Sequence, residues 1–141
     1  MFVQDRDSAR RFFLETWQKY RQSRPLEPLE EIVAAVILAH PEYHGLLEDE
    51  EEALSSEYTV AAARTNPFLH MGMHVALREQ LSADRPQGIA AFYNARLKRF
   101  NDPHALEHRM MECLGEVLWR AQRDNLLPDE AAYLDCLGKI S

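Results

Sequence analysis

Apolar residues recur at helical spacing in nearly every segment of this 141-residue chain, and no segment shows the apolar–polar alternation of a half-buried strand. Glycine is scarce, with five residues, which suits helices better than a β-protein with many turns. Two segments also carry helix-start signals, because Asn66 precedes Pro67 and Asp102 precedes Pro103. These patterns predict an all-α protein, a helical bundle of about five to six helices.

The length of the chain is that of one ordinary domain, so we expect a single helical domain over residues 1–141. Residues 5–22 place Phe13, Trp17 and Tyr20 at helical spacing, which predicts an aromatic stripe that packs in the core. Residues 25–40 form a second apolar helix whose buried face ends at His40. Pro41 follows, so this helix either kinks there or stops while Pro41 begins a new one.

Composition excludes several classes of protein. The formal net charge of −7 argues against a nucleic-acid partner, because phosphate binding depends on clustered Lys and Arg. The longest apolar run, residues 32–39, is far shorter than a membrane span, and the N-terminus resembles no signal peptide. We therefore expect a cytoplasmic protein with no membrane partner. In that compartment Cys113 and Cys136 are most simply reduced thiols that pack as small apolar residues.

The histidines form the most specific pattern in the sequence. All six lie in three pairs with four-residue spacing, in the segments HPEYH, HMGMH and HALEH, whereas random placement gives about 0.2 such pairs. Residues four apart share one helix face, so both imidazoles of a pair can reach one ion. Inward-facing imidazoles need partners, and a transition metal supplies one. The predicted ligands are His40, His44, His70, His74, His104 and His108.

Carboxylates that flank the third pair are candidates to complete the site. Glu107 and Glu112 lie on either side of the stripe formed by His104 and His108. Tyr43 is a candidate donor to a ligand. The pair across Pro41 is the least regular of the three, and His40 is the ligand that we expect to be missing.

Two functions of different classes remain open at this point. The first is a metal-binding bundle with a His-rich non-haem centre of one or two ions, either iron or zinc. The second is a non-catalytic interaction or regulatory module whose histidines are structural. A haem with two axial histidines is less favoured, because the chain lacks a CxxCH motif. The sequence decides neither whether the protein is an enzyme nor what small-molecule or protein partner it has. A monomer and a homodimer that shares the site are both compatible with it.

Several segments together resemble a known family. HPEYH, NPFLHMGMHVALREQ, DRPQGI, HALEHRMMECLGEVLWRAQR and PDEAAYLDCL are similar to an uncharacterised proteobacterial family known only as a domain of unknown function. The resemblance covers almost the whole chain and implies a small, soluble bacterial protein, but it brings no activity and no catalytic residue. The ligand style is also similar to that of hemerythrin-like and DinB-like metal-binding bundles, without a shared order of motifs.

Overall fold

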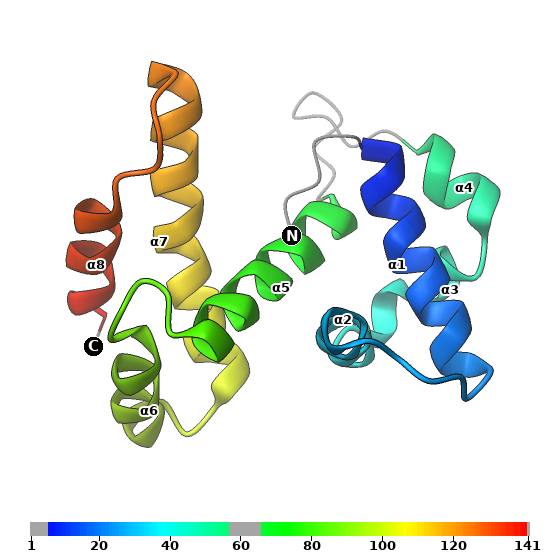
Figure 1. Ribbon diagram of the computed structural model, residues 1–141, viewed down its shortest axis with the longest axis horizontal. Helices are drawn as coiled ribbons and strands as arrows, with labels where there is room; N and C mark the ends of the chain where they lie inside the picture. The colour runs from blue at the N-terminus through cyan, green and yellow to red at the C-terminus, as the bar shows by residue number, and fades with distance from the viewer. Residues whose placement is uncertain (1–5, 57–65, 141) are drawn as a thin grey trace. The chain divides into compact units, whose positions relative to one another are not determined.

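The computed structural model describes residues 6–56 and 66–140, and over these residues the protein is helical, with no strand (Figure 1). The elements are α1 (Arg6–Arg21), α2 (Pro28–Leu38), the 3-10 turn η1 (Pro41–Tyr43), α3 (His44–Leu47), α4 (Glu50–Ser55), α5 (Pro67–Ala83), α6 (Ile89–Phe100), α7 (Pro103–Asp124) and α8 (Glu130–Gly138). The all-α prediction is confirmed. The predicted number of five to six helices is too low, because residues 41–55 form a 3-10 turn and two short helices.

The helix-start signals act as the sequence predicts. Asn66 accepts hydrogen bonds from the backbone N–H groups of Phe68 and Leu69, and α5 begins at Pro67. Asp102 accepts one from the backbone N–H of His104, and α7 begins at Pro103. Each cap satisfies a donor that the first helical turn leaves without an intrahelical partner.

The chain divides into two compact units, Met1–Ala76 and Leu77–Ser141, and the boundary falls within α5. No result tests the prediction of a single domain over residues 1–141, which stays a prediction. None of the helices in the described residues is long and apolar enough to cross a membrane.

The first unit is built on α1 and α2, with α3, α4 and the beginning of α5. Its core includes Phe13, Trp17, Val33 and Ile37, so the predicted burial of the aromatic stripe holds for the first two aromatics. Tyr20 differs, because it lies near the end of α1 and is 41% exposed. The side chain of Arg10 is also buried and donates to the backbone carbonyls of Ala53 and Ser56, at the end of α4.

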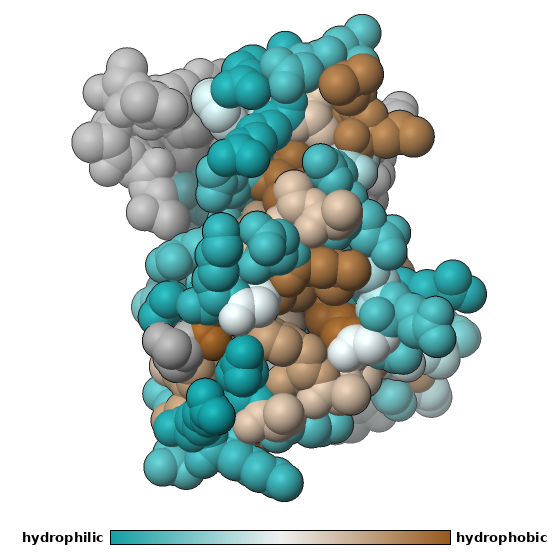
Figure 2. Space-filling model, turned by 90° about the vertical axis from the view of Figure 1, so that its left-hand side faces the viewer, coloured by the Kyte–Doolittle hydropathy of each residue, from teal (hydrophilic) through white to brown (hydrophobic). Residues whose placement is uncertain are grey.

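The second unit contains the end of α5 together with α6, α7 and α8. Its buried apolar side chains come from every one of these helices: Leu77, Ile89, Leu106, Met110, Met111, Leu114, Val117, Tyr133 and Leu137. Figure 2 shows the side on which α6 and α8 lie, where hydrophobic surface forms patches between hydrophilic ones. Large exposed apolar residues of this unit include Trp119, Leu126 and Leu127.

The two cysteines are joined by a disulfide between α7 and α8, so the expectation that they are reduced thiols is wrong for this structure. Their Cα atoms are 5.8 Å apart, a normal separation for a disulfide. The two cysteines are 23 residues apart in the sequence, and they meet because α8 folds back along α7.

Glu30 provides a prediction about stability. Its side chain is buried, accepts a 2.8 Å hydrogen bond from Lys19 and caps the backbone N–H of Glu27. The hydrogen bond from Lys19, followed by that from Glu27, lowers the pKa of Glu30 in the folded state. The stabilisation is therefore present above the ordinary glutamate pKa and is lost as the pH falls through the folded-state value.

We expect Glu30→Gln to lower the free energy of unfolding at pH 7, and this difference from the parent protein to shrink as the pH is lowered below about 4. Urea unfolding at a series of pH values measures the difference. Glu31→Gln, at an exposed position of the same helix, is the control and should have little effect. A difference that stays constant from pH 7 to pH 3 would contradict the role of the carboxylate charge.

Candidate metal centre

His40 is held in place by the end of α2. Its side chain is 3% exposed, and its Nδ1–H donates a 2.8 Å hydrogen bond to the carbonyl of Val36. The bond to a carbonyl requires the proton on Nδ1, which leaves the lone pair of a neutral ring on Nε2. Histidines that ligate metals commonly donate their other ring N–H to a backbone carbonyl in this way.

His70 and His74 lie one turn apart on α5, next to His40. The ring centroid of His40 is 5.1 Å from that of His70 and 4.8 Å from that of His74, and His74 is fully buried. The Nε2 atoms of His70 and His74 are 3.3 Å apart. Metal–nitrogen bonds of about 2.0–2.1 Å in a tetrahedral site place two nitrogens about 3.3 Å apart. Three of the predicted ligands of the first unit thus converge, and the spacing of one pair suits a common ion.

His44 points elsewhere. Its Nε2–H donates a 2.8 Å hydrogen bond to the carbonyl of Ile37, and its ring packs against Trp17 with centroids 4.5 Å apart. The reason is local, because η1 separates His40 from His44 and the two residues do not share a continuous α-helix. Pro41 thus separates the two histidines of this pair, as the sequence suggested. The histidine that lies away from the cluster, however, is His44 and not His40.

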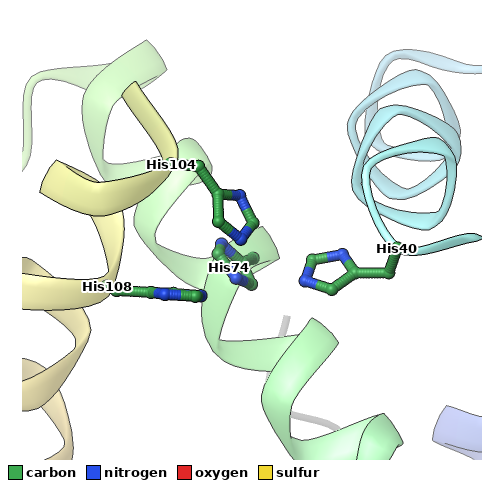
Figure 3. Close-up of side chains that lie close together, drawn as sticks. All are labelled: His40, His74, His104 and His108. Carbon is green, nitrogen blue, oxygen red and sulfur yellow. The ribbon is translucent and has the colours of Figure 1, made fainter. Parts of the chain in front are cut away.

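His104 and His108 come from the first turns of α7. Their ring centroids are 4.3 Å apart, and both side chains are half-buried. Asp102 and Pro103 start α7 directly before this pair, so both residues lie on a regular helix with the expected spacing. Figure 3 draws these two side chains with His40, which follows α2, and His74 of α5.

The two predicted carboxylates are both in ion pairs. Glu107 is buried and accepts from Arg78, with Oε1 3.2 Å from Nε and Oε2 3.4 Å from Nη2. The side chain of Glu112 is 75% exposed, and an oxygen of it lies 3.7 Å from Arg109. Glu107 thus faces α5 rather than solvent, whereas Glu112 lies on the outer face of α7.

Two further residues are relevant to the histidine segments without being candidate ligands. The ring of Tyr43 stacks on His40 with centroids 5.5 Å apart, and burial raises the pKa of its phenol. This contact is a stacking contact, whereas the sequence had suggested a hydrogen-bond donor. Sequence reasoning missed Arg78, although Arg78 lies four residues after His74 and therefore on the same side of α5.

Over the described residues the protein is thus helical, with one cluster of histidines in each unit. A hydrogen bond fixes the imidazole ring of His40 in the first of these clusters. Residues 5–139 match the family described as Domain of unknown function (DUF1841), and the chain belongs to this family. No curated protein and no solved structure is similar enough to match.

The Arg78–Glu107 ion pair provides a second prediction. We expect Glu107→Gln to lower the free energy of unfolding by about 1–2 kcal/mol, because Arg78 then loses its charged partner in a largely buried position. Any metal content should be the same in the variant and in the parent protein, since the carboxylate already has a partner. Urea unfolding and elemental analysis measure the two quantities.

Glu112→Gln is the matched control, because it removes a carboxylate from an exposed position on the same helix. It should change neither quantity. Loss of metal in the Glu107 variant would instead make Glu107 a ligand, and an equal loss of stability in both variants would contradict the role of burial.

Proposed function

We propose that the protein binds a transition-metal ion, zinc or iron(II), through His40, His70 and His74 of the first unit, with His104 and His108 of the second unit as further candidate ligands. The observation that carries the proposal is the convergence of His40, His70 and His74 within the first unit, with the Nε2 atoms of the α5 pair 3.3 Å apart. The geometry of His40 adds support, since metal-ligating histidines commonly donate their other ring N–H to a backbone carbonyl, as Nδ1–H of His40 does to Val36.

The continuity of α5 supports the inclusion of the second unit. The helix carries His74 in the first unit and, one turn later, Arg78, whose guanidinium pairs with Glu107 on α7 in the second unit. Glu107 directly precedes His108 in the sequence. α5 therefore carries a His pair of the first unit and, in the second unit, the ion-pair partner of the residue next to His108.

The donor set favours one ion over two. Dinuclear centres in helical bundles depend on carboxylates that join the ions, and both candidate carboxylates are in ion pairs with arginines. Neutral imidazole suits zinc and iron, and four nitrogens complete a tetrahedral zinc site. Such a site is closed and structural. A centre in which one histidine stays unbound keeps a position for water, which the metal would activate.

A second candidate function is a helical module whose histidines are structural. The observation that favours it is that His40 and His44 both donate to carbonyls in the last turn of α2, which satisfies acceptors at the helix end without any metal. This function requires no ion at the other histidines. Metal content therefore separates the two candidates.

The test is elemental analysis of protein purified without a His tag, before and after addition of Zn(II) or Fe(II). We expect about one ion per chain in the parent protein and less than about a tenth of that in His74→Ala and His108→Ala. His44→Ala is the matched control, because it removes an imidazole from the same segment as His40, and its metal content should equal that of the parent protein.

Circular dichroism of each variant separates loss of a ligand from loss of the fold. His108 is half-buried, so its variant should keep the helices of the parent protein. The elemental analysis itself distinguishes the ions, since it measures zinc and iron separately. A parent protein that binds less than about a tenth of an equivalent of either metal would overturn the proposal in favour of structural histidines.

A further inference from the structure

The disulfide joins α8 to the rest of the second unit. α8 has nine residues, and helices shorter than about 12–15 residues are only marginally stable alone in water. Its other contacts include buried Tyr133 and Leu137, a 2.7 Å hydrogen bond from the Tyr133 hydroxyl to Gln80 on α5, and a 3.4 Å hydrogen bond from Arg96 on α6 to the carbonyl of Gly138. α8 is thus held by a small number of contacts, and the disulfide between Cys113 and Cys136 is the covalent one.

The two sulfurs differ in their access to solvent. Cys113 is 4% exposed and lies in the core face of α7, whereas Cys136 is half-buried on α8. Both residues line a solvent-open cavity of about 200 Å³, together with Arg109, Lys139 and two glutamates. The cavity has one negative side chain for each positive one, so its formal charge is zero and it does not repel a thiolate.

We propose that Cys113–Cys136 is a thiol-exchange site, at which a small thiol enters this cavity and attacks Cys136. Thiol–disulfide exchange requires access of a thiolate to one sulfur of the disulfide. The cavity provides this access at Cys136, and its formal charge of zero does not repel the attacking thiolate. This proposal does not depend on metal binding.

The reaction balances without a further reagent. The thiolate forms a bond to Sγ of Cys136 while the Cys113–Cys136 bond breaks, and its electron pair leaves on Cys113 Sγ, which then takes up a proton. A second thiol attacks the mixed disulfide and releases Cys136 as a thiol. Two thiols are oxidised to one external disulfide, and the protein disulfide gains two electrons and two protons.

Reduction removes the covalent contact and leaves α8 docked only through Tyr133, Leu137 and their neighbours. A disulfide that closes a loop of this length stabilises by constraining the open state, and its loss increases local opening on the order of 100-fold. The consequence is a terminal helix whose docking on α7 follows the thiol–disulfide balance of the surroundings.

The experiment treats the native full-length chain with dithiothreitol, counts thiols with a chromogenic disulfide and follows amide hydrogen exchange by mass spectrometry. We expect two thiols per chain and exchange in α8 that is faster on the order of 100-fold, with exchange in α6 unchanged. The double variant Cys113→Ala/Cys136→Ala should exchange rapidly in α8 before dithiothreitol is added and should not respond to it.

Two further variants test the site of attack and the specificity of the response. In Cys113→Ser the remaining Cys136 thiol should react with iodoacetamide at least about tenfold faster than Cys113 does in Cys136→Ser, because the latter thiol is buried. Tyr133→Phe removes the bond to Gln80 but keeps the disulfide, so its α8 exchange should still respond to dithiothreitol. The proposal is overturned if native protein yields no thiols although urea-unfolded protein yields two, or if thiols form while α8 exchange stays unchanged.

Discussion

Two carbonyls in the last turn of α2, those of Val36 and Ile37, determine where the histidines of the first unit point. Pro41 has no N–H and cannot continue α2, so these carbonyls accept 3-10-type bonds from the backbone and have room for a side-chain donor as well. His40 donates to Val36 and His44 donates to Ile37, each through one ring nitrogen. These two bonds place one ring next to His70 and His74 and the other next to Trp17. A requirement of helix termination thus determines which imidazole lies beside His70 and His74.

α5 is the second element on which the candidate centre depends. It carries His70 and His74 at regular spacing, and one turn beyond His74 it carries Arg78. The ion pair between Arg78 and Glu107 uses both nitrogens and both oxygens of a matched fork, which restrains the orientation of the two helices within the second unit. Because Glu107 adjoins His108, the same ion pair also restrains the beginning of α7. The carboxylate that the sequence position suggested as a ligand is thus the partner of an arginine in this structure.

Sequence patterns predicted those features that depend on neighbours along the chain. The starts of α5 and α7 follow from a capping side chain before proline, and the pairs His70–His74 and His104–His108 follow from helical spacing alone. The features that the sequence did not predict depend on contacts between segments. His40 and His44 point in different directions because a 3-10 turn separates them. Glu107 is in an ion pair because Arg78 lies opposite it. Cys113 forms a disulfide because α8 folds back along α7. The same residue types at the same spacing are compatible with these contacts and with their absence, so only the packed structure shows which contacts form.

Because Cys113 and Cys136 form a disulfide, the redox state of the compartment affects how α8 is held. Reducing compartments keep accessible thiols reduced, and oxidising ones keep disulfides closed. Cys136 borders a cavity that is open to solvent, so its state follows the surroundings more readily than a bond between two buried sulfurs would. In a reducing compartment the docking of α8 rests on Tyr133, Leu137 and the bond to Gln80, and in an oxidising one a covalent bond is added to these contacts. α8 is therefore held more strongly when the disulfide is formed than when it is reduced. The helix that it packs against, α7, also carries His104 and His108.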